Sequence, residues 1–515
     1  MIAYTDRGLS EPLQRTLITI CVMMATIMQA LDTTIANVAL PYMQGSLSAT
    51  IDQVSWVLTS YIVAAAIMTA PVGWLATRYG VKRVLVIAAA GFTFASMLCG
   101  IAQNIEQIVG YRLLQGIFGA ALVPLSQAVM LTIYPPEKRG WAMSLWGLGV
   151  MIGPIMGPTL GGWLTENYSW RWVFYINLPF GMATVLGLIA LMRDLPSERK
   201  PVFDWFGFLA LSIAIGSLQL MLDRGEQLGW FDSTEVWIEA GVALAGAYFF
   251  LAHTLTWPTP FVPIEIFKDR NFVIGLGFMF VTGILLLASA ALMAPFLTGV
   301  MGYPIIEAGW LLGTRGIGMA IAMLFAGKIM GVTGPRAMLF AGLMLSAGSL
   351  YLSIDFSPDT SPRTIAWVSA VQGVGLAFLF VPLNTVALST LPAAFRTEGT
   401  AMWTLIRNLG SSIGVSIVIA NLTNKTTLMR ARLVESVTDF NSGLTDPLAA
   451  PLNPATEQGR ALLENLVNQQ AAIIAYANDF KLMMVLCLLA LPFVFLIKTP
   501  AILMPGAKPA PVDAH

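Results

Sequence analysis

Long apolar stretches separated by short polar breaks run along almost the whole chain. A helix that crosses a membrane needs roughly 20 mostly apolar residues, and fourteen stretches of about that length can be placed. Their approximate limits are 16–38, 53–76, 83–103, 107–133, 141–163, 173–193, 205–222, 236–256, 272–298, 305–330, 337–354, 364–389, 398–421 and 479–498. The pattern predicts an all-α integral membrane protein with 14 transmembrane helices.

An internal repeat relates the two ends of the chain. Three pieces of the first half recur in the second half, in the same order and at a nearly constant offset close to 257. They are QGIFGAALVPLSQ (115–127) with QGVGLAFLFVPLN (372–384), YPPEKR (134–139) with LPAAFR (391–396), and GWLATRYGVKR (73–83) with GKIMGVTGPR (327–336). Two parallel six-span halves, related by an axis along the membrane normal, are the architecture of major facilitator transporters.

The same repeat predicts the domain organisation. Spans 2 and 4 match spans 10 and 12, so six spans repeat as six and two spans are left between them, in a 6 + 2 + 6 arrangement. We expect an N-terminal six-helix bundle in residues 1–200, two inserted helices in 201–260 and a C-terminal six-helix bundle in 261–515. A long loop on the outer side is expected at about 422–478.

The composition agrees with a membrane protein and argues against several kinds of ligand and cofactor. Of the 515 residues, 57% are hydrophobic and only 11% are charged, against about 25% charged in soluble proteins. The 28 basic and 28 acidic residues balance, so no basic surface indicates nucleic acid. With two histidines and three scattered cysteines, neither a metal site nor a cofactor is expected. The chain also lacks a P-loop pattern, which argues against ATP as the energy source.

Lysine and arginine collect on one side of the predicted spans, and this bias predicts the orientation. If the N-terminus is cytoplasmic, the inner side holds most of the basic residues, whereas the short outer loops hold only three, Arg171, Arg224 and Arg363. Both termini are therefore expected in the cytoplasm. The first apolar run lacks a small-residue cleavage site and is too long for a signal peptide core, so it is expected to remain as the first span.

Asp32 is the one carboxylate that we place deep within an apolar run. An ionisable group inside a span is costly, which makes it a functional candidate, and it could take up and release protons. Arg112 is the natural partner: by helix rise both residues lie very roughly 10 Å below the outer surface. We expect them to meet and to couple proton binding to transport. The alternative is an acid that a partner neutralises permanently.

Further polar residues within spans are weaker candidates for a substrate cavity. They are Asn37, Gln115, Gln127 and Arg407. The glutamines and the asparagine could equally hold helices together. Arg407 and Arg315 lie near the middle of their spans, where a cation needs a partner or water, and neither has an obvious acid nearby in the sequence.

Span 5 contains an unusual number of helix-breaking residues, in GVMIGPIMGPTLGG (149–162). Gly149, Gly153, Gly157 and Gly161 recur every fourth residue and predict a smooth stripe that another helix can approach closely. Pro154 and Pro158 are expected to bend the helix, which membrane helices tolerate. The motif, which ends at Gly162, has two interpretations. It either serves helix association alone or closes the cavity against leakage of protons or substrate, and in both cases it acts through packing.

These motifs, with LDTTIANVALP (31–41), YRLLQGIFGAA (111–121) and WRWVFYINLPFG (170–181), resemble those of the fourteen-span drug:proton antiporters of the major facilitator superfamily. LDRGEQLGWF (222–231) and the long loop before the last span resemble the EmrB type.

The resemblance implies a latch on the cytoplasmic side in the loop between spans 2 and 3. Its residues here are Gly73, Arg78, Gly80, Lys82 and Arg83. This chain has Thr77 where the family usually has an acid, so an ionic latch is in doubt.

The resemblance further implies a proton-coupled antiporter in the bacterial inner membrane that exports hydrophobic or amphipathic toxic compounds. The alternative is a dedicated exporter of a specific metabolite or siderophore. A membrane enzyme is disfavoured, because clustered histidines and acids are lacking. The piece TEQGRALLENLVNQQAAIIAYAND (456–479) reads as an amphipathic helix. It is expected either to cap the outer vestibule or, as in the EmrB type, to contact a periplasmic adaptor protein that leads to an outer-membrane channel.

Overall fold

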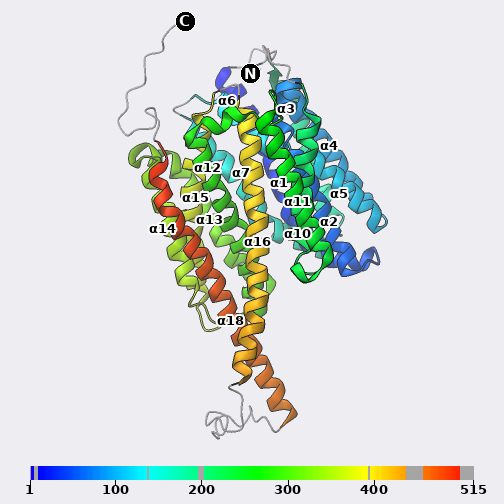
Figure 1. Ribbon diagram of the computed structural model, residues 1–515, viewed down its shortest axis with the longest axis vertical. Helices are drawn as coiled ribbons and strands as arrows, with labels where there is room; N and C mark the ends of the chain where they lie inside the picture. The colour runs from blue at the N-terminus through cyan, green and yellow to red at the C-terminus, as the bar shows by residue number, and fades with distance from the viewer. Residues whose placement is uncertain are drawn as a thin grey trace.

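The computed structural model describes residues 2–4, 10–135, 138–194, 202–392, 395–435 and 456–498. Nearly all of this is helix, as the apolar pattern predicts. Figure 1 shows an elongated bundle in which successive helices run up and down. Helix α1 (Glu11–Ser46) begins at the end of the bundle where α18 (Glu457–Ala490) finishes. We call this the α1 end and the opposite one the far end.

The other helices follow in chain order with short connections. The first half contains α2 (Ile51–Thr69), α3 (Val72–Tyr79), α4 (Val81–Ile101), α5 (Ile105–Gly119), α6 (Leu122–Ile133), α7 (Arg139–Asn167), α8 (Trp172–Tyr175) and α9 (Asn177–Leu191). Then come α10 (Trp205–Arg224), η2 (Trp230–Asp232), α11 (Thr234–Thr256) and η3 (Ile264–Lys268). The second half contains α12 (Arg270–Pro295), η4 (Phe296–Val300), α13 (Ile305–Thr333), α14 (Pro335–Ser353), α15 (Pro362–Ser389), α16 (Arg396–Glu435), α18 and η7 (Leu491–Leu496).

Twelve of the described helices are long and apolar enough to cross a membrane, and the bent pair α2 and α3 makes thirteen. Each falls on one of the stretches that the hydrophobic pattern predicts. The predicted fifth span is α7, a 29-residue helix in the middle of the bundle, which is not among the thirteen. The exact number of fourteen therefore stays a prediction.

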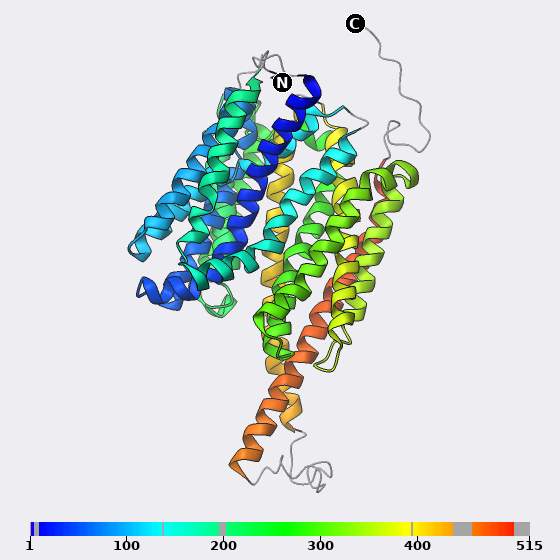
Figure 2. The same cartoon turned by 180° about the vertical axis from the view of Figure 1, so that it is seen from behind.

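Helices pack mainly with neighbours from their own half of the chain. In the first half, α1 packs against α7 and α9, and α5 packs against α2 and α4. In the second half, α15 packs against α13 and α14, while α16 packs against α12 and α18. Helices α10 and α11 form a pair, and α10 reaches both α2 and α16 (Figures 1 and 2).

The internal repeat is visible in the backbone of two tight connections. Gly80, between α3 and α4, has φ +94°, and Gly334, between α13 and α14, has φ +80°. A positive φ is readily adopted only by glycine, which explains why both copies of the repeat keep a glycine there. The two turns lie at corresponding places in the two halves.

The segment expected as a long outer loop at about 422–478 is helical where the structure describes it, and its second part agrees with the amphipathic helix expected at 456–479. Helix α16 continues without a break to Glu435, and α18 starts at Glu457; residues 436–455 lie outside the described residues. The ends of the two helices project beyond the bundle at its far end (Figures 1 and 2) and do not fold back over it. We call these ends, residues 422–435 and 456–478, the stalk.

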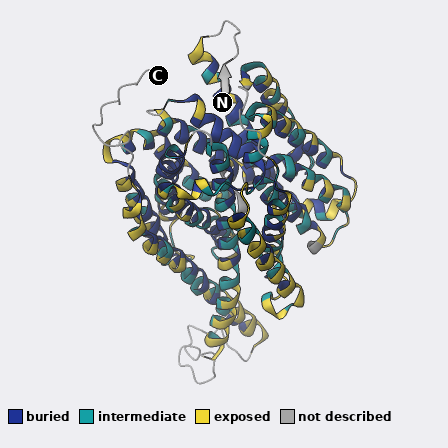
Figure 3. Ribbon diagram, turned by 45° about the horizontal axis from the view of Figure 1, so that its top comes forward, coloured by how far each residue is buried: buried dark blue, intermediate teal, exposed yellow. Residues whose placement is uncertain are grey.

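The core lies between the helices, and the outer faces of the bundle are apolar. Figure 3 shows buried positions concentrated inside, with exposed positions along the outer helix faces and the stalk. Large exposed side chains such as Leu244, Tyr248 and Trp310 suit contact with lipid. The expectation of an all-α chain needs one correction: Ile2–Tyr4 pairs antiparallel with Met192–Asp194 as a two-stranded ribbon.

Candidate functional site

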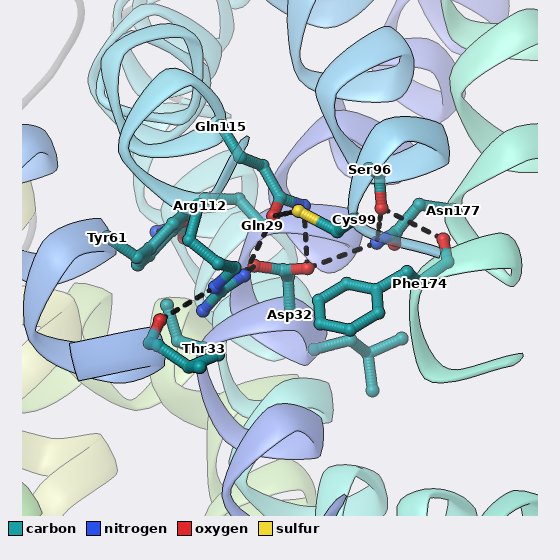
Figure 4. Close-up of polar contacts among 12 residues, drawn as sticks. Gln29, Asp32, Thr33, Tyr61, Ser96, Cys99, Arg112, Gln115, Phe174 and Asn177 are labelled. Carbon is teal, nitrogen blue, oxygen red and sulfur yellow. Dashed lines mark hydrogen bonds and ion pairs between the residues drawn. The ribbon is translucent and has the colours of Figure 1, made fainter. Parts of the chain in front are cut away.

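The structure brings Asp32 and Arg112 together in a buried ion pair. Arg112 Nη1 lies 2.6 Å from Asp32 Oδ2, between α5 and α1. The arginine Nε also donates to the Val57 carbonyl at 3.1 Å, and the guanidinium carbon lies 4.3 Å from the centre of the Tyr61 ring. Both α2 and α5 therefore hold the guanidinium in one orientation (Figure 4). The helix rise predicts only that Asp32 and Arg112 lie at the same depth. The packing of α5 on α2 explains why the Arg112 side chain is directed towards α1.

Amide side chains complete the coordination of the carboxylate. Gln115 Nε2 donates to Asp32 Oδ1 at 2.8 Å, and its Oε1 accepts from Arg112 Nη1 at 2.8 Å. Asn177 Nδ2 donates to Asp32 Oδ1 at 3.2 Å and to Ser96 Oγ at 3.0 Å (Figure 4). The sequence reasoning missed Asn177, Ser96 and Tyr61. Asn177 is the one amide in WRWVFYINLPFG, so its polarity inside an apolar motif was the available signal.

The pair is closed to solvent in this conformation. The side chains of Asp32 and Arg112 are 0% and 1% exposed. Removing one partner of such a pair leaves a buried charge that costs several kcal/mol. Adding a proton to Asp32 has the same consequence for Arg112. The arrangement can therefore convert the gain or loss of one proton into a change in helix packing, once another conformation lets water reach it.

Gln127 and Asn37, two of the predicted cavity residues, lie in different surroundings. Gln127 is fully buried on α6, and its Nε2 donates to Asn384 Oδ1 on α15. Asn384 also accepts from Trp403 Nε1 at 2.8 Å. Gln127 and Gln115 thus fit the interpretation that they hold helices together. Asn37 is exposed on α1.

Two arginines lie in the middle of the second half without an acidic partner among the described residues. Arg315 Nη2 donates to the Leu286 carbonyl at 2.7 Å. Arg407 makes a long hydrogen bond of 3.4 Å to its neighbour Asn408. Neither belongs to an ion pair in the described part of the chain. Both are only partly buried, so ligand or water could still reach them.

The glycine stripe of α7 packs directly on α1. A Cβ added to Gly153 would collide with the Ala30 carbonyl, and one on Gly157 with the Thr34 hydroxyl. That hydroxyl donates to the Gly153 carbonyl at 2.9 Å. Gly149 and Gly161 also face α1, whereas a Cβ on Gly162 would only touch Val38 at 3.9 Å. The stripe therefore sets the α1–α7 distance beside Asp32. The side chains of Pro154 and Pro158 lie outside the described part of the structure.

The loop between spans 2 and 3 contacts the other half at the α1 end. Thr77 Oγ1 donates to Glu398 Oε1 at 2.7 Å, from α3 to α16. Gly73 lies against the same residue, because an added Cβ would come within 2.7 Å of Glu398 Cα. At the position where the family pattern has an acid, Thr77 thus meets a carboxylate that comes from the opposite half. Lys82 Nζ donates to the Ile189 carbonyl at 2.9 Å, and Arg78 and Arg83 are exposed.

A second carboxylate is buried among the described residues, although it lies at the edge of an apolar stretch and not deep within one. Asp479 on α18 is also 0% exposed and accepts from Asn421 Nδ2 at 2.6 Å. It escaped notice because it lies at the boundary between the amphipathic piece and the last apolar stretch. Asp204 is 8% exposed, but it caps α10 by accepting from Gly207 N, so its role there is structural.

Comparison with known proteins adds evidence from the whole sequence. The pattern of the Major Facilitator Superfamily matches residues 22–415. The chain is 34% identical to multidrug export protein EmrB of Escherichia coli strain K12, over 95% of this chain and 96% of that protein. It is also 34% identical to fatty acid resistance protein FarB of Neisseria gonorrhoeae, over 94% of this chain and 96% of that one.

Solved structures with low sequence identity share the fold. The proton:xylose symporter XylE superposes with a TM-score of 0.58 at 14% identity, over 92% of this chain and 95% of XylE. The human organic anion transporter MFSD10 superposes with a TM-score of 0.58 at 12% identity, over 93% of this chain and 100% of that chain. At these identities the comparison supports the fold and not the substrate.

Proposed function

This chain belongs to the Major Facilitator Superfamily, and on that premise we propose that it is a proton-driven antiporter that exports hydrophobic and amphipathic toxic compounds. It is a multi-pass helical transporter related to bacterial multidrug exporters, as expected of an inner-membrane protein. The observation that carries the proposal is the buried Asp32–Arg112 pair. Nothing in the described geometry favours a dedicated exporter of one metabolite or siderophore.

Proton coupling follows from the electrostatics of the pair. When Asp32 takes a proton on a carboxylate oxygen, the charge that balances Arg112 disappears, while the Val57 carbonyl and Gln115 amide still hold the guanidinium. An unbalanced buried cation is unfavourable, so protonation favours a conformation in which Arg112 reaches water or substrate. Release of the proton restores the pair and the present packing. One proton then drives one change of conformation.

In the conformation described here, the two halves of the bundle are bonded to each other at the α1 end. The Thr77–Glu398 bond and the Gln127–Asn384 bond both connect the halves there. If that end is cytoplasmic, these contacts close the inner side. Export requires them to open so that substrate enters from the cytoplasm, and to close again before it leaves.

We assign the α1 end to the cytoplasm because basic residues collect there. Lys82 and Arg83 lie at the start of α4, Arg139 at the start of α7 and Arg336 near the start of α14, as the positive-inside rule requires. Taking α7 as a span brings the thirteen candidates to fourteen. The N-terminal bundle, the inserted pair α10–α11 and the C-terminal bundle then follow the limits 1–200, 201–260 and 261–515.

On this orientation the stalk projects into the periplasm. A projecting pair of helices suits a periplasmic adaptor protein, which would lead substrate towards an outer-membrane channel. Leu428, Val434, Leu462 and Leu466 on the stalk are between 41% and 52% exposed, which offers apolar contacts to such a partner.

Uptake by inverted membrane vesicles tests the function. With the wild-type chain, an imposed gradient that is acidic inside the vesicle should drive accumulation of a fluorescent amphipathic drug, and collapse of the gradient should release it. Accumulation that continues without any gradient would contradict proton coupling, while leaving the fold unaffected.

A further inference from the structure

A buried carboxylate that the transport mechanism above does not use lies at the base of the stalk. Asn421 directly precedes the stalk segment of α16, and Asp479 directly follows that of α18. The two helices pack side by side there (Figures 1 and 2). We propose, resting on the exporter function and the orientation above, that Asp479 is a second proton-binding site. A proton from the periplasm keeps the two helices together at the base of the stalk, and its loss lets them part.

The two oxygens of Asp479 are unequally bonded. Oδ1 accepts a hydrogen bond from Asn421 Nδ2 at 2.6 Å, whereas Oδ2 is buried without a hydrogen-bond partner among the described residues. Asp32 and Asp204, the other two buried carboxylates of the described chain, accept hydrogen bonds on both oxygens. A bare ionised oxygen in an apolar site is unfavourable, so this geometry fits a neutral, protonated carboxyl group.

Aromatic and apolar packing closes the site. Tyr476 lies one turn before Asp479 and Phe480 directly after it, and the two rings are 6% and 1% exposed. Both pack against Phe296 at the start of η4, with ring centres 4.8 Å and 6.0 Å apart. Met483, one turn further along α18, is also buried. Because the carboxyl group is shut off from water in this conformation, it can exchange a proton only when α16, α18 or η4 moves.

Most of the elements around Asp479 bring no charge to it. Helix α18 packs against α12, α14, α16, η4 and η7. Segments η4 and η7 contain no ionisable residue. The charged residues of α12 and α14 are Arg270 and Arg336, and both lie within the first two residues of their helices, at the α1 end. A counter-charge for an ionised carboxylate must therefore come from α16 or α18.

Lys425 and Lys481 are the nearest cations on those two helices. Lys425 lies four residues beyond Asn421, on the same face of α16 and one turn nearer the tip of the stalk, while Lys481 is exposed. Neither forms an ion pair with Asp479 in the described part of the chain. An ionised Asp479 is therefore stabilised by moving outwards, towards Lys425 and water, and this movement disrupts the contact with Asn421.

Other polar contacts hold the stalk helices together only weakly. The ion pair of Arg430 with Glu464, at 2.9 Å, joins α16 to α18 within the described stalk, and its side chains are 51% and 62% exposed. Such an exposed pair contributes little to stability. Gln469 Nε2 donates to the Val300 carbonyl of η4 at 2.9 Å, a contact that does not involve α16. Ionisation at the base should therefore change the separation of the two stalk helices.

Infrared difference spectroscopy of the purified full-length chain in phosphatidylcholine nanodiscs tests proton binding. The difference between wild type and Asp479→Asn isolates the signal of this one residue. It should contain the C=O stretching band of a protonated carboxyl group at mildly acidic pH and lose that band at mildly alkaline pH. Glu457→Gln, which removes an exposed acid of the same helix, should give no such difference. Absence of the band at acidic pH would overturn the proposal, and so would a band that persists at alkaline pH, because Asp479 would then exchange no proton.

Distances between spin labels attached to Leu428→Cys and Leu462→Cys test the effect on the stalk. These positions, on α16 and α18, are 42% and 44% exposed, whereas the native cysteines are buried. The distance distribution should be narrow at acidic pH and broaden at alkaline pH. In Asp479→Asn, whose neutral amide replaces the protonated acid, the broadening should be lost. A wild-type distribution that ignores pH, or equal broadening in Asp479→Asn, would show that Asp479 does not control the stalk.

Vesicle uptake separates failure of this site from failure of the exporter function. If gradient-driven drug uptake is found while the stalk distances ignore pH, the exporter function stands and the second proton site is rejected. If uptake needs no gradient but the pH response of the stalk follows Asp479, the site stands and proton-driven transport is rejected.

Discussion

The side chains of Gln127 and Asn384 are hydrogen-bonded to each other across the two halves of the bundle, although they are 257 residues apart, which is the offset of the internal repeat. Trp403 Nε1 donates to the same Asn384 oxygen. Next to them, Trp146 and Phe380 stack with ring centres 5.8 Å apart. The two halves thus meet where their repeated helices α6 and α15 approach each other, and Asn384 is the residue on which the polar contacts converge.

Asn384→Leu should therefore weaken the junction between the halves. The change strands the Trp403 indole N–H and the Gln127 amide, and each unpaired buried group costs about 1–3 kcal/mol. We expect a clearly lower thermal unfolding temperature in detergent. Gln127→Leu is the matched control and should cost less, because Gln127 Oε1 already has no hydrogen-bond partner among the described residues. An equal or larger loss in Gln127→Leu would show that Asn384 is not the centre of the contact.

Arg112→Lys should uncouple transport from the proton gradient. A lysine keeps the charge but cannot bond Asp32, Gln115 and the Val57 carbonyl at once as the planar guanidinium does. Gradient-driven uptake into inverted vesicles should fall by at least about tenfold, whereas equilibrium drug binding should remain. The idea that this geometry carries coupling would be abandoned if the lysine variant transported at the wild-type rate.

Gly153→Ala should be much more damaging than Gly162→Ala. The first substitution drives a Cβ into the Ala30 carbonyl of α1, whereas the second meets only Val38 at 3.9 Å. Overpacking of this kind costs about 1–3 kcal/mol. Unfolding temperatures of the two purified variants should therefore differ by several degrees. If both alanines are equally tolerated, close approach of α7 to α1 is not what the stripe provides.

Charged substitutions on the stalk should lower the drug resistance of intact cells without changing drug uptake by isolated vesicles. Leu462→Asp with Leu466→Asp alters two exposed positions of α18 that are 44% and 41% accessible. If an adaptor binds there, intact cells should lose drug resistance while vesicle uptake stays at the wild-type level. Asn465→Asp, on the same helix, serves as the control. Full resistance in cells that carry the double variant would argue against an adaptor on this face.

The sequence predicts most of the architecture because membrane spans and internal repeats can be recognised directly from the order of the residues. Apolar stretches locate the helices, and the glycines at 80 and 334 mark turns that need positive φ. The family prediction is confirmed, and the major facilitator fold with it. Helix rise is enough to place Asp32 and Arg112 at one depth, because it depends only on position in each span.

What the sequence does not reveal depends on packing between distant helices. Asn177 joins the Asp32 network from α9, and Glu398 meets Thr77 from the other half; no local pattern relates these positions. Residues 422–435 of the stalk were expected to form a loop because polar residues interrupt their apolar pattern, whereas the helix at 456–479 was predicted from its amphipathic pattern. A helix that leaves the membrane needs no continuous apolar face, so α16 and α18 extend past the point where hydropathy falls.

Asp32→Asn in inverted vesicles tests the central claim most directly. The asparagine cannot take up or release a proton, but its amide oxygen can still accept a hydrogen bond from Arg112, which donates to one of the two Asp32 oxygens. The account predicts that the variant loses gradient-driven uptake and yet still exchanges labelled for unlabelled drug when no gradient is imposed. If the variant accumulates drug in response to the gradient as the wild type does, Asp32 does not carry the proton.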